Sequence, residues 1–345
     1  MAEAGVEILN LLRRDNLVSE NEVCVTPLPG GVSSNVFLIQ DADRSFVVKQ
    51  ALPRLKVKDL WKADTSRNRN EYEYLRYVGR IVPESVPSVF AVANDYFTME
   101  YIGPELESWK QLLLSGLHYP EHALRAAKLL GTIHRESAAD PAAKRLFDTT
   151  ANFHQLRTEP YLITTGQRHP ALRKYFEEEA SRLESTREAL VHGDYSPKNF
   201  LVGRDRLVLL DCEVAWYGDP AFDLAFLLCH LLLKSLYHAP RNVHMDQIMD
   251  GVIETYYREQ KFTAALQQRC DRNTGRLLLL LLLARVDGKS PVEYLNAEDK
   301  LRFVRAFVAS ELERNGGSLR EIAIGWFRAL QRQYKGDLRK SGGRQ

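Results

Sequence analysis

The sequence predicts an α+β fold of two lobes: a small strand-rich N-terminal lobe at residues 1–102 and a larger, mainly helical C-terminal lobe at 103–345. Short apolar segments bounded by turn residues fill the first lobe, and long segments with helical spacing of apolar residues follow Gly103 and Pro104. The length of 345 residues agrees with two lobes, since it exceeds what one hydrophobic core usually serves.

The N-terminal lobe is predicted to contain mostly strands, with one helix inserted among them. A short amphipathic helix around Ile8 and Leu12 opens the chain. Strands are predicted over 23–26, 36–40, 46–50, 89–93 and 96–101, and the inserted helix over 67–79. The residues PGGVSSN at 29–35 form a turn-rich loop between the first two strands.

The C-terminal lobe is predicted to be helical, except for a loop, strand, turn and strand over 191–211. Helices are predicted over 108–116, 120–137, 170–189, 220–238, 245–260, 262–284, 298–314 and 318–334. The apolar runs Leu224–Leu233 and Leu277–Ala284 are shorter than the roughly 20 residues of a membrane span, so we expect them to be buried helices.

Composition excludes several classes of function. Lys plus Arg number 47 and Asp plus Glu number 45, so the net charge of +2 gives no strong attraction to nucleic acid. The four cysteines form no CxxC pair, which argues against a zinc or redox motif. Because the N-terminus also lacks the pattern of a signal peptide, we expect a cytoplasmic monomer or homodimer without a membrane or nucleic-acid partner.

One stretch of the C-terminal lobe carries the chemistry. Residues 192–199 read HGDYSPKN, and the apolar run that follows ends at Asp211. Phosphoryl transfer from ATP needs one carboxylate for the acceptor hydroxyl and two oxygen ligands that hold Mg²⁺ against the phosphates. We therefore predict that Asp194, Asn199 and Asp211 are catalytic, with Asn199 and Asp211 as metal ligands. A hairpin with ordinary turn residues is the alternative, and the extended pattern argues against it.

A lysine of the N-terminal lobe extends this hypothesis to the nucleotide. Lys49 lies near the end of the strand at 46–50, where its ammonium can reach the phosphates if a carboxylate holds it. The next helix offers Glu71 and Glu73, and Glu71 is favoured because it lies one turn before the inward-facing Leu75. A solvated lysine at a strand edge is the alternative.

Two further segments are predicted to contact the nucleotide. In the loop at 29–35, glycines let backbone N–H groups approach phosphates, although an ordinary hairpin turn would look the same. These contacts would be Gly30, Gly31, Ser33 and Asn35. The second segment, 97–103, joins the two lobes, and in it the carbonyl of Glu100 and the N–H of Ile102 would face the adenine edge. The alternative is an edge strand leading into a loop.

Three residues are predicted to support the site. His192 would brace the loop that contains Asp194, and Asp223 would support the same loop from the start of the helix at 220–238. Glu213, two residues after Asp211, would add a metal or supporting contact. A surface carboxylate is the alternative for Glu213.

These residues together resemble the aminoglycoside phosphotransferase/choline kinase-like family. The shared pattern is HGDxxxxN at 192–199, a strand ending at Asp211, and GDPxxDLA at 218–225. The resemblance spans about Pro29 to Leu233 and implies a protein-kinase-like two-lobed fold and ATP-dependent phosphorylation of a small-molecule hydroxyl. It also implies the roles given above to Lys49, Glu71 and the catalytic residues.

Within this family, the 5-methylthioribose kinase branch is similar at residues 49–53, KQALP, with Val57 and Trp61 after them. Residues 285–288, RVDG, weakly resemble the segment in which an arginine of that branch contacts the sugar. Those kinases carry a paired arginine where this chain has Ala284 and Arg285, so the substrate does not follow from the resemblance.

The acceptor is expected to bind the helical lobe, which would face the γ-phosphate. A sugar or aminoglycoside favours aromatic stacking with polar or charged anchors, and an amino alcohol such as choline favours an aromatic cage. The predicted contacts are Trp216, Tyr217, His230 and Arg285. Two rival classes remain: a nucleotide-binding regulatory module without transferase activity, and a protein kinase-like enzyme. The presence of Lys49, Asp194 and Asp211 argues against a module without transferase activity. The short spacer between Asp211 and Gly218 leaves no room for the activation loop of a protein kinase.

Overall fold

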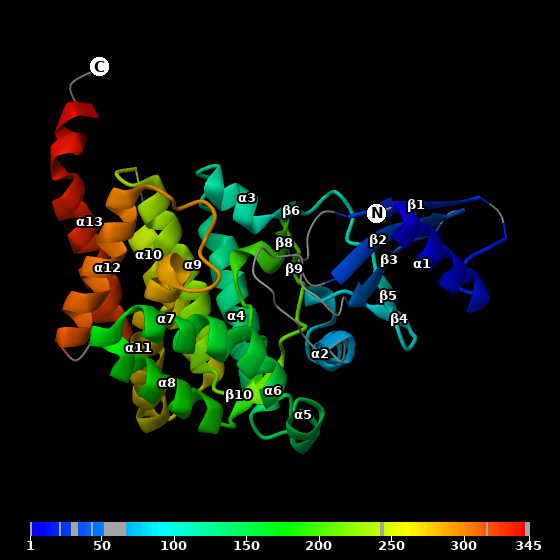
Figure 1. Cartoon of the computed structure of the whole chain (residues 1–345), viewed down its shortest axis with the longest axis horizontal. Helices are drawn as coiled ribbons and strands as arrows, with labels where there is room; N and C mark the ends of the chain where they lie inside the picture. The colour runs from blue at the N-terminus through cyan, green and yellow to red at the C-terminus, as the bar shows by residue number, and fades with distance from the viewer. Residues whose placement is uncertain are drawn as a thin grey trace.

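The computed structural model describes residues 2–20, 22–28, 34–42, 44–51, 67–241, 245–314 and 317–341 of the 345-residue chain. They form an α+β fold with a strand-rich lobe at one end of the long axis and a larger helical lobe at the other (Figure 1). The predicted fold class is confirmed. The division at residue 102 stays a prediction, because one apolar core joins Val47 and Phe97 to Trp109 and Phe200 across it.

A five-stranded antiparallel sheet forms the N-terminal lobe, in the order β1-β2-β3-β5-β4. Its strands are β1 (Val23–Pro27), β2 (Ser34–Asp41), β3 (Arg44–Ala51), β4 (Val89–Val92) and β5 (Phe97–Glu100). These are the predicted strands with slightly different ends. They are short, rich in β-branched and aromatic residues, and separated by turn residues, which is why their sequence signal is clear.

Two helices cover the two faces of this sheet. They are α1 (Ala2–Arg14) and α2 (Arg67–Ile81). Phe46 and Val48 of β3 pack in the cluster formed with α1, whereas Val47 packs in the cluster that contains α2 residues. Because successive side chains of a strand point to opposite faces, Lys49 shares the face of Val47. The alternation therefore directs Lys49 toward α2, the helix that carries Glu71.

Two small antiparallel sheets frame the HGDYSPKN segment in the helical lobe. One has the order β6-β8-β9 and the other pairs β7 with β10. Their strands are β6 (Glu107–Ser108), β7 (Ala189–Val191), β8 (Phe200–Val202), β9 (Leu207–Leu209) and β10 (Trp216–Gly218). The segment thus runs from the end of β7 to the start of β8, and Asp211 follows β9.

Helices form the rest of the C-terminal lobe, with α4 packed on α10 and α9 packed on α11 (Figure 1). They are α3 (Trp109–Leu114), α4 (Pro120–Ser137), α5 (Pro141–Leu146), α6 (Thr150–Phe153), α7 (Thr164–Arg168), α8 (Arg173–Ser185), α9 (Ala221–His238), α10 (Met245–Gln260), α11 (Ala264–Asp287), α12 (Glu298–Glu313) and α13 (Leu319–Ser341). Short 3-10 helices occur at Pro83–Ser85, Pro170–Leu172 and Pro197–Asn199, and a π-helix at His154–Ile163. The sequence predicts nothing over 138–169, where α5, α6, α7 and the π-helix lie.

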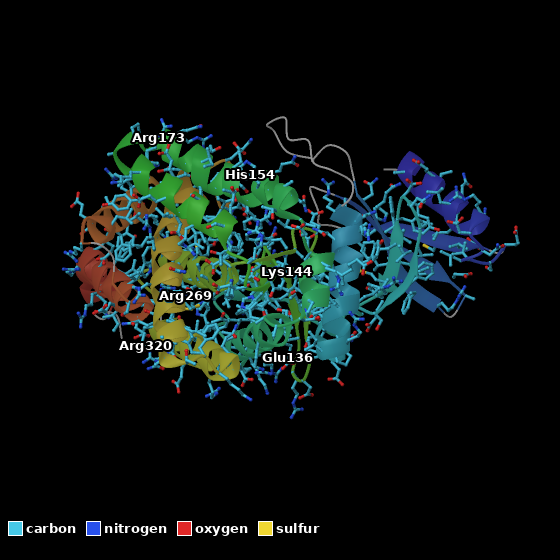
Figure 2. The ribbon with its side chains drawn as sticks, turned by 90° about the horizontal axis from the view of Figure 1, so that it is seen from below. Glu136, Lys144, His154, Arg173, Arg269 and Arg320 are labelled. Carbon is cyan, nitrogen blue, oxygen red and sulfur yellow. The ribbon has the colours of Figure 1, made fainter. Side chains whose placement is uncertain are left out.

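The apolar runs predicted to be buried helices are indeed buried. Every residue from Leu277 to Ala284 lies in the core within α11. Among the described helices, α9 has the length and composition of a membrane span, but 89% of that stretch is buried inside the protein. Charged side chains such as Arg173, Arg269 and Arg320 instead lie on the outside of the helical lobe (Figure 2).

Shortening a buried side chain of α11 tests this core. Leu281 is 0% exposed, so Leu281→Ala is expected to lower the free energy of unfolding by about 2–5 kcal/mol through lost apolar burial and a cavity. Leu266 lies on the same helix but is 40% exposed, so Leu266→Ala should change the free energy of unfolding by less than about 0.5 kcal/mol. Urea unfolding followed by circular dichroism measures both, and equal losses would contradict the buried position of α11.

Candidate active site

The carboxylate of Asp223 holds the start of the catalytic loop, as we call residues 192–199. Asp223 lies in the first turn of α9, is 0% exposed, and accepts the main-chain N–H of His192 at 2.7 Å and that of Gly193 at 2.9 Å. Gly193 has a φ of 78°, and a Cβ there would lie 2.9 Å from the carbonyl oxygen of Val214. Only glycine fits this position without strain.

His192 ties the catalytic loop to the end of β9. Its Nε2–H donates to the carbonyl of Leu210 at 3.1 Å, and its Nδ1 accepts the N–H of Asp194 at 3.1 Å. Burial lowers the pKa of the imidazole, so the ring is neutral and can donate at one nitrogen while accepting at the other. His192 therefore fixes the distance between the loop and the residue before Asp211.

Asp194 lies between two cations. Its carboxylate is 2.8 Å from Nζ of Lys198 and 3.2 Å from Nη2 of Arg157, and the residue is 5% exposed. Burial alone would raise the pKa of the Asp194 carboxyl, but Lys198 and Arg157 outweigh burial and lower this pKa. The side chain is therefore ionised at neutral pH.

Asn199 is the last residue of the catalytic loop, and Asp211 follows β9 beside it. Asn199 donates from Nδ2 to the carbonyl of Asp194 at 2.9 Å, which leaves its amide oxygen for a metal, and its own carbonyl accepts the N–H of Leu210 at 2.9 Å. Asp211 follows with a φ of 61°, a conformation that residues with a side chain rarely adopt. An amide and a carboxylate oxygen are hard donors of the kind that Mg²⁺ prefers.

Lys49 joins the N-terminal lobe to this group. Its Nζ lies 2.7 Å from the carboxylate of Glu71 and 2.8 Å from Oδ1 of Asp211; the contact with Glu71 is buried, and that with Asp211 is partly exposed. Glu71, rather than Glu73, is thus the carboxylate beside the lysine. Burial alone would lower the pKa of Lys49, but Asp211 and Glu71 outweigh it and raise this pKa.

A third carboxylate lies beside this ion pair. Glu71, Asp211 and Glu213 each place one oxygen within 4.8 Å of the others, which makes the group a possible cation site. Glu213 is 8% exposed and its Oε2 lies 3.2 Å from Nε of Arg67 at the start of α2. It is therefore a buried partner within an ion-pair network, and the surface alternative for Glu213 does not hold.

The predicted nucleotide contacts are described only in part. Gly30, Gly31 and Ser33 lie outside the described residues. Asn35 lies in β2, opposite β3. Glu100 ends β5, and its carboxylate accepts a hydrogen bond from Arg206 at 3.0 Å, while Ile102 is 8% exposed. The roles of these residues toward a nucleotide stay predictions.

Trp216 and Tyr217 are not part of this group. Trp216 is 0% exposed and stacks on Phe153 with ring centroids 4.2 Å apart. Tyr217 is 5% exposed, and its hydroxyl donates to the carbonyl of Ala138 at 2.8 Å. The pairing of β10 with β7 places both rings among core side chains. Both side chains therefore lie in the core, and their contact with a substrate stays a prediction.

Arg285 connects to the catalytic loop through one aromatic ring. Its Nη1 donates to the hydroxyl of Tyr161 at 3.0 Å, and its guanidinium carbon lies 5.5 Å from the centre of that ring. The guanidinium carbon of Arg157, the partner of Asp194, lies 5.6 Å from the same centre. His230 is buried on α9, where the centre of its ring lies 5.0 Å from that of Phe226.

Sequence reasoning misses two cations that contact Asp194, Arg157 and Lys198, and a third, Lys234, that lies near Arg285. Lys198 lies inside the HGDYSPKN pattern, so its position was readable although its role was not. Lys234 interrupts the apolar sequence of α9, and a lysine among buried leucines is a signal for an unusual environment. Arg157 lies in the π-helix, and no pattern in the sequence indicates it.

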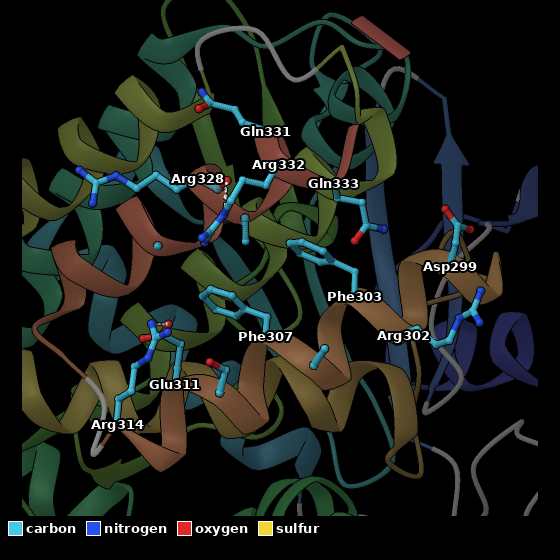
Figure 3. A pocket seen from close by; sticks show the side chains of 14 residues that line it. Asp299, Arg302, Phe303, Phe307, Glu311, Arg314, Arg328, Gln331, Arg332 and Gln333 are labelled. Atoms are coloured by element: carbon cyan, nitrogen blue, oxygen red, sulfur yellow. Dashed lines mark hydrogen bonds and ion pairs between the residues drawn. The ribbon is translucent and has the colours of Figure 1, made fainter. Parts of the chain in front are cut away.

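A hollow between α12 and α13 lies apart from these residues (Figure 3). Its volume is about 1420 Å³, and its lining includes Phe303, Phe307, Arg302 and Arg328. None of the described lining residues belongs to the predicted site. The two helices lie at the end of the molecule opposite the N-terminal lobe (Figure 1), so this hollow is separate from the catalytic loop.

The two lobes and the group of residues between them define a phosphotransferase of the kinase-like class. Residues 25–253 match the phosphotransferase enzyme family known as APH, and this range is more than half of the chain. The chain belongs to this family, and it is a small-molecule kinase.

Individual relatives agree with this family assignment. A methylthioribose kinase of Bacillus velezensis is 26% identical over 277 residues, which is 69% of this chain and 69% of that protein. Among solved structures, an ethanolamine kinase of Plasmodium vivax has a TM-score of 0.54 at 14% identity and covers 87% of this chain and 85% of its own. The amicoumacin kinase hAmiN also has a TM-score of 0.54, at 16% identity, with coverages of 90% and 95%. At these identities, the two structures support the fold alone.

The role of Asp223 in holding the loop can be tested by stability. In Asp223→Asn, one side-chain oxygen is replaced by an NH₂ group that cannot accept an N–H, so the free energy of unfolding is expected to fall by about 1–3 kcal/mol. Asp205→Asn, at an exposed position between β8 and β9, is the matched control and should change it by less than about 0.5 kcal/mol. Chemical unfolding measures both, and an unchanged stability of Asp223→Asn would contradict this role.

Proposed function

We propose that this kinase transfers the γ-phosphoryl group of ATP to a hydroxyl of a small molecule, with Mg²⁺ as the metal. The observation that carries the proposal is the meeting of Lys49, Asp194, Asn199 and Asp211 from both lobes. Lys49 donates to Asp211 and Asn199 donates to Asp194. His192 links the two pairs, because it accepts the N–H of Asp194 and bonds the carbonyl of Leu210, the residue before Asp211. This set matches what phosphoryl transfer needs: a phosphate-binding cation, oxygen ligands for a metal, and a carboxylate for the acceptor.

The roles follow from the charges of the groups. Lys49, held by Glu71, would bind the phosphates of ATP. Asn199 and Asp211 would hold Mg²⁺, because an amide and a carboxylate oxygen are hard donors, and the hydrogen bond from the N–H of Leu210 to the carbonyl of Asn199 ties the two segments together. When bound there, Mg²⁺ would offset the charge that develops on the transferred group.

Asp194 would accept the hydrogen bond of the acceptor hydroxyl. Its lowered pKa makes it a weak base but a well-oriented ionised acceptor, so its main contribution would be the position of the hydroxyl for in-line attack. The neighbouring Lys198 and Arg157 would keep it ionised and would also favour negative charge near the reacting atoms.

The relatives support this chemistry. The relative from Bacillus velezensis is a methylthioribose kinase, and hAmiN was solved with AMP-PNP, Ca²⁺ and Ami. A sugar-like hydroxyl compound is therefore a reasonable first acceptor for this chain, and ATP a reasonable donor.

Replacement of the catalytic carboxylate tests the transfer step. Asp194→Asn is expected to lower kcat at least about 100-fold, since an amide cannot accept the hydroxyl proton or orient it with a full charge. The affinity for ATP should stay within about threefold, because ATP is bound by other residues. Coupled ATP-consumption assays and nucleotide titration measure both, with Asp205→Asn as control. Near-normal turnover of Asp194→Asn would contradict the assignment.

Replacement of the predicted metal ligand tests the second role. Asp211→Asn is expected to weaken Mg²⁺-dependent nucleotide binding at least tenfold, an effect of about 1.4 kcal/mol. Binding of a fluorescent ATP analogue is measured over a range of Mg²⁺ concentrations and again with EDTA. If wild type and Asp211→Asn respond to Mg²⁺ in the same way, Asp211 does not hold the metal.

A further inference from the structure

The helical lobe contains two buried cations that have no carboxylate partner among the described residues. Lys234 is 1% exposed, and its Nζ lies 3.5 Å from the hydroxyl of Tyr294 and 4.8 Å from the centre of that ring. Arg285 is 8% exposed and donates to the hydroxyl of Tyr161 and to Ser290. Burial of a charge without a counter-ion is costly, so a bound group of negative charge is the natural complement.

Two buried nitrogens beside these cations also lack partners in the described part of the chain. They are Nε of Arg285 and Nε2 of His230. Burial, followed by the repulsion of Arg285 and Lys234, lowers the pKa of His230 well below its ordinary value. The neutral imidazole therefore has one N–H to donate, and all three side chains offer donors to a single acceptor group.

This group lies close to the catalytic carboxylate. The guanidiniums of Arg285 and Arg157 both contact the ring of Tyr161, and Arg157 is ion-paired with Asp194. Lys198 also contacts Asp194, and its side chain is 48% exposed, so solvent reaches the group around Asp194 at Lys198. A small molecule whose hydroxyl meets Asp194 could thus extend toward Arg285.

We propose that the acceptor of this kinase carries an anionic group, a carboxylate or a phosphate, in addition to its hydroxyl, and that Arg285, Lys234 and His230 bind that group. The proposal rests on the proposed function for the hydroxyl end of the substrate. Guanidinium and ammonium groups bind both kinds of anion through short, charge-assisted hydrogen bonds. The same charges disfavour polycationic aminoglycosides and quaternary amino alcohols, which would place like charges together.

Lys234 gives the site a measurable signature. Burial, with the repulsion of Lys110 and Arg285, lowers the pKa of Lys234 to about 7, while Glu293 and Cys229 oppose this. Lys110 is itself ion-paired with Glu293. At pH 8 the empty site therefore holds a mostly neutral amine. A bound anion raises its pKa again, so binding at this pH takes up a proton, and affinity falls as the pH rises above 7.

Calorimetric titration of the full chain tests the anion site directly. The protein is first saturated with AMP-PNP and Mg²⁺ to fill the nucleotide site, and inorganic phosphate and acetate are titrated as the two probes. Saturable binding of either is expected, with a heat at pH 8 that depends on the ionisation enthalpy of the buffer. The stronger probe tells whether a phosphate or a carboxylate is preferred. The absence of saturable binding for both would overturn the proposal.

Matched variants identify the residues. Arg285→Gln and Lys234→Met are expected to weaken binding of the probe about tenfold to a hundredfold through the loss of one charged donor. Arg272→Gln, at an exposed position of the same α11, should leave it unchanged. Lys234→Met should also raise the midpoint of thermal unfolding, because it removes a buried amino group that has no carboxylate partner among the described residues, so its weaker binding would not come from misfolding. Equal affinities in all four proteins would overturn the assignment.

An acceptor comparison separates this inference from the proposed function. ATP consumption is measured with ribose, ribonate, ribose 5-phosphate, choline and an aminoglycoside. A preference of at least tenfold in kcat/KM for an anionic acceptor, lost in Arg285→Gln, is the expected result. A preference for a neutral or cationic acceptor would overturn the anion site and leave the kinase activity intact. Anion binding that depends on Arg285, without ATP consumption for any acceptor, would instead overturn the proposed function.

Discussion

The geometry of the active site depends on one buried carboxylate, that of Asp223. It accepts two consecutive main-chain N–H groups at the start of the catalytic loop, and its place in the first turn of α9 gives its charge a favourable helix dipole. From there, His192 holds Leu210, and Asn199 holds the carbonyl of Asp194. The functional side chains are thus positioned by a hydrogen-bonded backbone that begins at a residue with no chemical role of its own.

Sequence patterns predicted the elements that are long or strictly periodic. Strand β3 alternates between two cores, and this alternation is sufficient to place Lys49 opposite the helix of Glu71. The segment at 138–169 gave no such signal, because its helices are too short for a clear period and the π-helix contains Pro160. Arg157 was missed for this reason, although it contacts Asp194 directly.

The candidate site was predictable where it follows a local motif and unpredictable where it depends on tertiary pairing. The spacing of Asp194 and Asn199 is local, so the sequence predicts both as site residues, and in the structure Asn199 donates to the carbonyl of Asp194. The core position of Trp216 was not readable from the sequence, because an aromatic residue at this place can face either a ligand or the core, and the pairing of β10 with β7 buries it. Arg285 and Lys234 lie on different helices, and nothing in either helix alone indicates that the other cation is near.

The two sides of the catalytic loop differ in their balance of charge. On the nucleotide side, Lys49 is paired with Glu71 and Asp211, and these ion pairs stabilise the junction of the lobes before any ligand arrives. On the acceptor side, Lys234 and Arg285 have no such partner among the described residues, which lowers stability rather than raising it. A pKa of about 7 limits this cost for Lys234, because the amine can shed its charge while the site is empty. An anion that binds restores the positive charge of Lys234 and is attracted by it. In the proposed site, selectivity for an anionic acceptor would thus come from buried groups that cost stability while the site is empty.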